Sequence, residues 1–326
     1  MALGRGSTVA LTRIYFCCDV HGSEICFRKA LSVARRRIYE EDVVLVSGDL
    51  TGKKIIPIAR RDGVYKGNLL GSDIVAKSEV ELEAAKRRVA DAGCYPFVAE
   101  PEEIAKIGSD SEGTSKLFTQ LVVERMRDWM RRADQSLSES RVPFYMMPGN
   151  DDDPQIASIL GESKSVINPT SRVVPIDEDH EMISMGASNR TPWHTFDERS
   201  EEELKEMIES MISRARGSRG LIFNFHCPPY GSGLDVCPRL DEELRPIRVG
   251  SSILMGPAGS TAVRAAIEGH QPKLGLFGHI HESAGETTIG RTVCLNPGSE
   301  YSQGILRGYV VDVDRDSVVR YFRVEG

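Results

Sequence analysis

Two histidines, His279 and His281, stand two positions apart in the segment FGHIHES, directly behind the apolar run at 274–277. Side chains along a strand repeat every two residues, so two imidazoles at a strand end would lie on the same side of it. Such a pair can hold a metal ion, and it can equally be two surface residues of a loop. The rest of the sequence has to distinguish these interpretations.

The same arrangement, an apolar strand-like run followed by a side chain of metal-ligand type, recurs at four other places. In open α/β sheets, ligands bind in the crevice at the carboxyl ends of the strands, where such side chains meet. Each fragment alone is a weak signal, but five of them in one chain favour a shared site. The four additional fragments contribute Asp19 and His21, Asp49, Asn150 and Asp151, and His226.

The elements that must position these residues can be read from the periodicity of the chain. Apolar and β-branched runs indicate strands, and apolar residues three to four positions apart indicate helices. A capping box at Ser200 and Glu203 marks one helix start with particular clarity. We expect strands over 13–19, 42–50, 142–151, 171–177, 180–187 and 220–229, helices over 23–41, 200–217 and 260–270, and a closing hairpin that turns at 314–316.

Residues 53–140 separate the second expected strand from the third, and this distance is too long for a loop in a compact domain. A hairpin around 61–63 and helices near 78–92 and 115–138 are expected within it. We therefore interpret the chain as one domain over 1–326 with an inserted helical cap over 53–140. Because the segment leaves just after Asp49, we expect the cap to overhang the site.

Composition argues against several classes of protein. The chain has 326 residues, a net charge of −7 and no basic run longer than three residues, which counts against a dedicated nucleic-acid surface. The N-terminus shows neither a signal peptide nor a membrane span. Seven cysteines without a C-x-x-C pair indicate reduced thiols in a cytoplasmic protein.

The order of the motifs D-x-H, G-D, G-N-(H/D), H and G-H-x-H resembles the calcineurin-like metallophosphoesterase superfamily. In detail the chain is similar to an Icc-like prokaryotic branch that carries a PGNDD segment, and the resemblance extends from residue 13 to about residue 322. It implies an α/β fold of the α+β type, in which two mixed β-sheets pack as a sandwich flanked by helices.

The resemblance also implies a dinuclear metal centre. Two divalent ions about 3.5–4 Å apart can clamp phosphoryl oxygens and lower the pKa of a water molecule between them. A shell of nitrogen and oxygen ligands suits Mn, Fe or Zn, and the sequence does not choose among these. The implied ligands are Asp19, His21 and His281 for one ion, Asn150, His226 and His279 for the other, and Asp49 as the bridge.

The implied reaction is hydrolysis of a phosphoric ester by a metal-bridging hydroxide, with phosphodiesters favoured over monoesters. Asn150 and the residue after it belong to the catalytic motif, but Asp151 stands where most relatives have a histidine that protonates the leaving group. Asp151 could be the acid if its pKa is raised. Alternatively, Asp151 and Asp152 orient neighbouring groups, and the proton comes from water or from His194. Lys53 and Arg190 could offer a cation to the phosphate.

Two other functions remain open from the sequence. A DNA nuclease of the same superfamily would use the same ligands, although the acidic balance of the chain counts against it. A non-catalytic metal-binding scaffold would also keep the fold, although such proteins usually have eroded ligands. We expect a small phosphorylated substrate and no membrane, and the sequence leaves the oligomeric state open.

Overall fold

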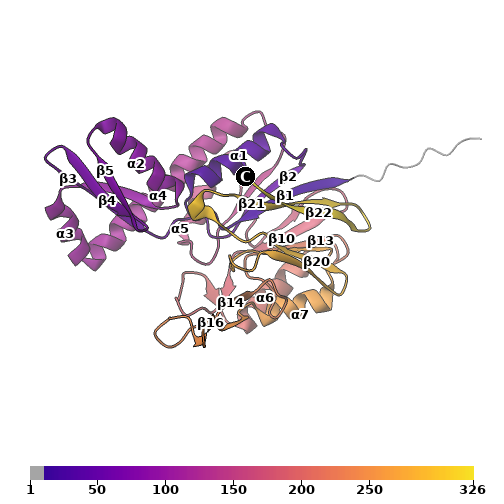
Figure 1. The fold of residues 1–326 in the computed structure, drawn as a ribbon. Helices are drawn as coiled ribbons and strands as arrows, with labels where there is room; N and C mark the ends of the chain where they lie inside the picture. The colour runs from indigo at the N-terminus through magenta and orange to yellow at the C-terminus, as the bar shows by residue number, and fades with distance from the viewer. Residues whose placement is uncertain (1–10) are drawn as a thin grey trace, which may run out of the picture.

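Two six-stranded mixed sheets packed face to face form the centre of the computed structural model, which describes residues 11–326 (Figure 1). In the first sheet, β1, β2, β7 and β8 are parallel, and the C-terminal hairpin adds two antiparallel strands beside β1. Its order is β22 (Val318–Glu325), β21 (Arg307–Val313), β1 (Thr12–Cys18), β2 (Val43–Ser47), β7 (Phe144–Met147) and β8 (Val166–Ile167).

The second sheet has a parallel centre of four strands with one antiparallel strand at each edge. Its order is β19 (Gly285–Ile289), β20 (Thr292–Asn296), β18 (Leu274–Leu276), β13 (Leu221–Phe225), β10 (Glu181–Met185) and β9 (Val173–Pro175).

Helices cover the outer face of each sheet, so the central strands are buried on both sides. This burial explains why β2, with the sequence VVLVS, and β13, with LIFNF, are almost continuously apolar instead of alternating. The predicted two-sheet sandwich flanked by helices is thereby confirmed. The first sheet packs against α1 (Glu24–Arg36), α4 (Ser111–Leu137) and α5 (Gln155–Leu160), and the second against α6 (Glu201–Ile212) and α7 (Thr261–His270).

The inserted segment is not purely helical, contrary to the expectation of a helical cap. It contains a four-stranded sheet of its own, whose first strand starts with alternating burial in the pattern iBeB. The expected hairpin is present, and Asp62 and Gly63 form its turn with φ of 51° and 74°. The elements are β3 (Ile55–Arg61), β4 (Val64–Leu69), β5 (Ser72–Ala76), β6 (Tyr95–Ala99), α2 (Glu79–Asp91) and α3 (Pro101–Ser109).

This inserted lobe, residues 55–110, has a separate hydrophobic core and projects away from the sandwich (Figure 1). The long helix α4 connects the two parts. Its C-terminal half packs in the core of the sandwich, where Trp129 stacks on Phe27 of α1 with ring centroids 4.1 Å apart. Glu24 of α1 accepts hydrogen bonds from Trp129 and Arg132, which fixes the helix on the sandwich. Residues 122–137 are therefore part of the main core.

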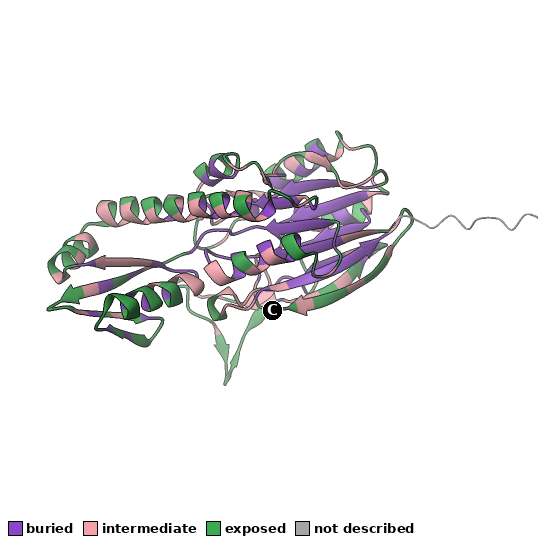
Figure 2. Ribbon diagram, turned by 90° about the horizontal axis from the view of Figure 1, so that it is seen from above, coloured by how far each residue is buried: buried purple, intermediate pink, exposed green. Residues whose placement is uncertain are grey.

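The connection over 230–259 carries short strands that extend from the sandwich as an exposed arm (Figure 2). Within residues 11–326, no helix has the length and apolar character needed to cross a membrane. The remaining short elements are β11 (Ser188–Asn189), β12 (Glu198–Arg199), β14 (Val236–Pro238), β15 (Arg248–Val249), β16 (Ser252–Ile253), β17 (Met255–Pro257) and the 3₁₀ helix η1 (Tyr301–Gln303).

Candidate metal centre

The predicted ligands follow the carboxyl ends of β1, β2, β7, β13 and β18, and several of them lie in tight turns. Asp19, His21, Asp49 and His279 all have left-handed backbone conformations, with φ between 39° and 67°. This region of φ/ψ space is costly for residues other than glycine and persists where the surrounding structure holds it. Each strand thus ends abruptly and turns its polar side chains toward one point between the two sheets.

The first group consists of Asp19, His21 and His281, whose candidate ligand atoms all lie within 4.8 Å of one another. The Nε2 atoms of His21 and His281 are 3.0 Å apart, and His281 Nε2 is 3.4 Å from Asp19 Oδ1. The backbone N–H of His279 donates to the Asp19 carboxylate at 3.1 Å and orients it. This is the set that the resemblance implied for one ion.

The second group consists of Asp49, His226 and His279, again within 4.8 Å. Asp49 faces both groups, because its Oδ1 is 3.3 Å from His226 Nε2 while its Oδ2 is 3.6 Å from His21 Nε2. One carboxylate therefore presents a separate oxygen to each group. That geometry is the one a bridging ligand requires.

Unpaired buried atoms test whether these residues fit a metal. Both ring nitrogens of His226 are buried and have no hydrogen-bond partner within residues 11–326, and the same holds for Oδ1 of Asn150. The amide nitrogen of Asn150 is used, since it donates to Thr195 Oγ1 at 2.7 Å. Buried polar atoms without partners are costly in a protein interior. Metal coordination would satisfy them, and the set of imidazoles, carboxylates and an amide oxygen matches the ligands of divalent transition metals.

Burial and the carboxylates control protonation of the histidines. Burial lowers the pKa of His21 to about 3 and that of His279 to about 4, which leaves both rings neutral and able to coordinate. Burial also acts on His226, but the Asp49 and Asp19 carboxylates outweigh it and raise its pKa to about 9. The two acids thus create a negative field at the centre of the site, which favours cations.

Two glycines allow the strand-end turns to approach each other. A Cβ atom at Gly48, where φ is 76°, would lie 1.9 Å from His226 Nδ1. A Cβ atom at Gly149 would lie 2.2 Å from Asp49 Oδ1. No side chain fits at either position, so the sequence motifs G-D and G-N require glycine for the backbone to reach the ligands.

The two acids that follow Asn150 have different environments. Asp152 is buried and accepts hydrogen bonds from the backbone N–H groups of Leu50, Thr51 and Gly149 at 2.8–2.9 Å, so it joins the turns after β2 and β7. This contact matches the expected orienting role for Asp152.

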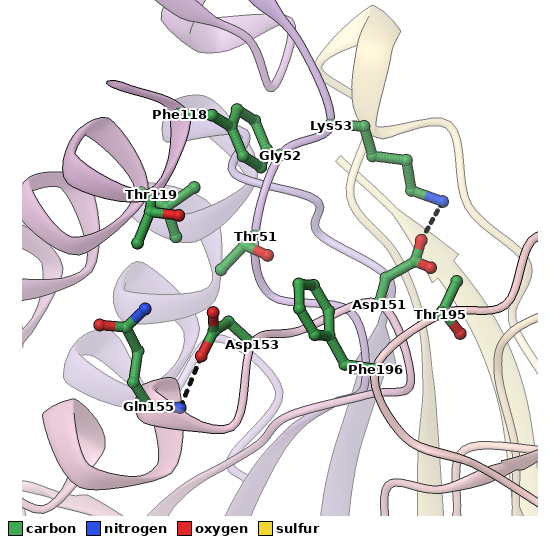
Figure 3. Close-up of a pocket in the computed structure, with 11 residues that line it drawn as sticks. Thr51, Gly52, Lys53, Phe118, Thr119, Asp151, Asp153, Gln155, Thr195 and Phe196 are labelled. Atoms are coloured by element: carbon green, nitrogen blue, oxygen red, sulfur yellow. Dashed lines mark hydrogen bonds and ion pairs between the residues drawn. The ribbon is translucent and has the colours of Figure 1, made fainter. Parts of the chain in front are cut away.

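Asp151 instead faces the cleft and forms an ion pair with Lys53, the first residue of the inserted segment (Figure 3). Its backbone N–H donates to Asp49 Oδ1 at 3.1 Å, and its carboxylate lies within 4.8 Å of ligand atoms of His21 and Asp49. Burial and the charge of Asp49 raise the pKa of Asp151, whereas Lys53 opposes the rise. Asp151 is therefore at the site, next to a cation that the sequence suggested only as one of several candidates.

The structure does not bring His194 into either ligand group. Its side chain is exposed, in a turn with φ of 51°. The adjacent residue, Thr195, is the one that contacts Asn150. A role for His194 as proton donor stays a prediction, and Arg190 is likewise exposed on the same loop.

Two more residues pack on the first group, and sequence reasoning missed one of them, Tyr301. The ring of Tyr301 lies 4.6 Å from that of His21, and Ser299 Oγ donates to the backbone carbonyl of Asp19 at 2.7 Å. Ser299 belongs to the NPGS segment that follows β20 and runs close to the site. Nothing in the sequence indicates that Tyr301 meets a histidine 280 positions earlier.

A cavity of about 230 Å³ adjoins the site on the side of Asp151 (Figure 3). The inserted segment and α4 form one wall, so residues within 53–140 do border the cleft, while the lobe itself extends beyond it. The lining consists of Thr51, Gly52, Lys53, Phe118, Thr119, Val122, Asp151, Asp153, Gln155, Thr195 and Phe196.

Comparison with known proteins gives one curated relative. "Uncharacterized protein MJ1162" of Methanocaldococcus jannaschii is 29% identical to this chain over 153 residues. The match covers 46% of this chain and 62% of the length of that protein. No family model matches the chain.

Solved structures share the fold at low sequence identity. One crystal structure has a TM-score of 0.56 with 13% identity and covers 97% of this chain and 99% of its own. The crystal structure of TT1561 of Thermus thermophilus has a TM-score of 0.52 with 13% identity over the same shares.

Proposed function

We propose that this chain, which has the sandwich fold of the calcineurin-like metallophosphoesterases, is a metal-dependent hydrolase of phosphoric esters. The observation that carries the proposal is Asp49, whose two oxygens face two separate groups of histidines and acids. Such an arrangement suits a pair of divalent ions and has no evident use as a structural zinc site, which would favour thiolate ligands.

The residues would divide as the motifs imply. Asp19, His21 and His281 would hold one ion, Asn150, His226 and His279 the other, and Asp49 both. Divalent ions bound there would neutralise charge on the phosphoryl oxygens and lower the pKa of a nearby water molecule. The protein supplies the imidazoles, of which burial keeps those of His21 and His279 neutral, and carboxylates fixed in a largely buried site.

Lys53 would add a fixed positive charge beside this centre. Its ammonium group pairs with Asp151 and lies close enough to Asp49 for that carboxylate to raise the pKa of Lys53, against the lowering effect of burial. A lysine there can contact a phosphoryl oxygen that the metal ligands leave free. Asp151 would hold Lys53 in place, or donate the proton to the leaving group.

We favour a diester as the substrate, and the cavity beside Asp151, which could take a second ester group, supports this choice. A small phosphorylated metabolite fits the cavity, and a dedicated nucleic-acid surface is not required. We propose that the protein is located in the cytoplasm.

The proposal is tested by metal analysis and turnover of the purified protein. We expect close to two equivalents of Mn, Fe or Zn, and hydrolysis of bis(4-nitrophenyl) phosphate that a chelator abolishes and added metal restores. If Asp151 donates the leaving-group proton, Asp151→Asn should lose most activity on esters with poor leaving groups and little on nitrophenyl esters. Full metal occupancy without turnover of any phosphoric ester would support the scaffold instead.

A further inference from the structure

The segment 191–198, which leads from β11 into β12, holds the candidate ligand Asn150 by two separate hydrogen bonds. The side-chain amide nitrogen of Asn150 donates to Thr195 Oγ1 at 2.7 Å, and the backbone N–H of Asp197 donates to the Asn150 carbonyl oxygen at 3.1 Å. Asn150 is therefore fixed at its main chain and at its side chain by one segment. That segment contributes no member to the ligand groups found within residues 11–326.

Glu198, at the end of this segment, organises its hydrogen bonds. Its carboxylate accepts from the backbone N–H of Thr191 at 3.0 Å and from that of Thr195 at 2.9 Å. It also accepts from the hydroxyl groups of both threonines, at 2.8 Å from that of Thr195. Burial alone would raise the pKa of Glu198, but the hydrogen bonds from Thr191 and Thr195 outweigh it and lower the pKa. The carboxylate is thus ionised at neutral pH and can only accept.

The direction of these bonds determines which end of the Asn150 amide lies toward Thr195. A threonine hydroxyl has one proton and two lone pairs, and the proton of Thr195 is used on Glu198. Thr195 Oγ1 can therefore only accept a further hydrogen bond, and of the two ends of the amide only the nitrogen can donate one. The amide oxygen of Asn150 is left buried, without a hydrogen-bond partner in the part of the chain that the structure describes.

We propose that Thr195 and Glu198 are positioning residues that fix the amide of Asn150, so that its oxygen and not its nitrogen is offered to a divalent cation. The proposal rests on the metal centre of the proposed function. An amide oxygen has lone pairs for a cation, whereas the NH₂ group would place its donor hydrogens against it. Residues that hold a metal ligand in place typically contribute about ten- to hundredfold to metal affinity.

Calorimetric titration of chelator-treated protein with Mn²⁺ tests the proposal without turnover. Thr195→Val removes the hydroxyl group but keeps the shape of the side chain. It should weaken one of two Mn²⁺ binding steps about ten- to hundredfold and leave the other step nearly unchanged, which also reports that the variant is folded. Thr195→Ser keeps the hydroxyl group and should bind like the unmodified chain.

Thr191→Val is the matched control. Thr191 also donates its hydroxyl proton to Glu198, but it makes no hydrogen bond to Asn150 among the described residues. Its loss removes a similar bond from the same carboxylate while the bond between Thr195 and Glu198 stays. Both Mn²⁺ binding steps of Thr191→Val should therefore match those of the unmodified chain.

A second background separates orientation of the amide from general support of the segment. Asn150→Asp presents an oxygen at both ends of the side-chain group, so its orientation no longer matters. In this background Thr195→Val should change Mn²⁺ affinity little, although it weakens one step in the native chain. Glu198→Ala frees the Thr195 proton to donate to the Asn150 oxygen, so it should weaken the same step, and Asn150→Asp should remove that loss too. A residue that only supports the segment would give equal losses in both backgrounds.

The outcomes separate this inference from the proposed function. Unchanged binding steps in Thr195→Val, or equal losses in Thr195→Val and Thr191→Val, overturn the positioning role even if the unmodified chain binds Mn²⁺ and hydrolyses esters. A loss in Thr195→Val that persists in the Asn150→Asp background overturns it as well. If the unmodified chain binds no Mn²⁺, the metal centre itself is refuted and this inference with it.

Discussion

The sandwich and the inserted lobe are both α/β structures, yet they use their side chains differently. Central strands of the sandwich are buried on both faces and place acids and histidines at their ends, as β1 and β2 do with Asp19 and Asp49. Strands of the lobe are buried on one face only and contribute no member to the ligand groups found within residues 11–326. The sandwich therefore carries the metal chemistry of the proposed function. The lobe is positioned to influence only which molecules reach the metal site.

The contact between the two regions combines side-chain contacts, such as the Arg28–Asp91 ion pair, with a close approach of backbone. Gly93 of the lobe packs so closely on the site that a Cβ there would lie 2.3 Å from the carbonyl oxygen of His21. Lys53 is the one described charge that enters the site from the inserted segment and pairs with a residue of the ligand groups. The different roles of the two regions can therefore be tested by substituting a few residues.

The largest effect is expected at the centre of the sandwich. Asp49→Asn keeps the shape of the bridge but removes the charge that offsets repulsion between two cations. We expect at least one of the two metal sites to empty and turnover of nitrophenyl esters to fall on the order of 10³-fold, equivalent to several kcal/mol of transition-state stabilisation. Elemental analysis of the purified variant, beside kinetics, measures both.

Asp62→Asn in the lobe is the matched control. Asp62 is an exposed turn residue with φ of 51°, a conformation that asparagine also tolerates. The metal content and turnover of the Asp62→Asn variant should equal those of the unmodified chain. Full metal occupancy in Asp49→Asn would show that Asp49 is not the bridge.

The second effect probes the contact between lobe and site. Gly93→Ala should lower the free energy of unfolding by about 3 kcal/mol, because the new methyl group meets the His21 carbonyl and the Tyr301 ring in addition to the strain of a left-handed alanine. Gly63→Ala has the same left-handed strain, with φ of 74°, but faces open space, and should cost about 1 kcal/mol. Urea unfolding measures the loss of stability in each variant. Equal losses would mean that Gly93 packs less closely on His21 than described.

The sequence predicts the structure of the sandwich better than that of the lobe. In the sandwich, apolar runs that stop at a ligand predict both the strands and the site, since burial on both faces leaves a strong signal. In the lobe, half-buried strands such as β5, with the sequence SDIVA, alternate too briefly to stand out, so the hairpin at 61–63 is the part of the lobe's sheet that was predicted.

Pairings between distant residues set the second limit. The motifs predict that His226 and Asp49 meet, but no local pattern pairs Lys53 with Asp151, Thr195 with Asn150 or Tyr301 with His21. Each of these contacts depends on loops whose course is fixed by packing of the whole chain. The metal ligands were predictable because metal binding requires particular residue types in a particular order along the chain. The contacts that support the ligands have no such requirement.

A smaller effect is expected at Asp312 on β21, a buried residue that none of the ligand groups includes. It accepts hydrogen bonds from Arg13 at 2.6 Å and Arg320 at 2.5 Å. Asp312→Asn should lower the free energy of unfolding by about 2 kcal/mol at neutral pH without changing metal content.

The pH dependence of this loss has a defined sign. Burial alone would raise the pKa of Asp312, but the hydrogen bonds from Arg13 and Arg320 outweigh it and lower the pKa. Its stabilisation is therefore complete above the unfolded value of about 4 and is lost as the pH falls through the lower folded value. Unfolding measured from pH 7 down to pH 3 should show the gap between the two proteins closing toward acid. A constant gap would assign the loss to packing.

The smallest effect is expected where the two regions meet. Lys53→Met removes the cation beside Asp151 but none of the ligands, so metal content should be unchanged, while kcat/KM for bis(4-nitrophenyl) phosphate should fall about tenfold, as one partly exposed charged contact predicts. Lys54→Met is the control, because Lys54 is also exposed but contacts no member of the ligand groups among the described residues. Lys53→Arg should restore part of the loss if charge is what matters. Inorganic phosphate should inhibit Lys53→Met more weakly than the unmodified chain, since the lysine would contact a phosphoryl oxygen. Unchanged inhibition and turnover would mean that Lys53 only holds Asp151. The inserted segment would then contribute no charge to phosphate binding at this residue.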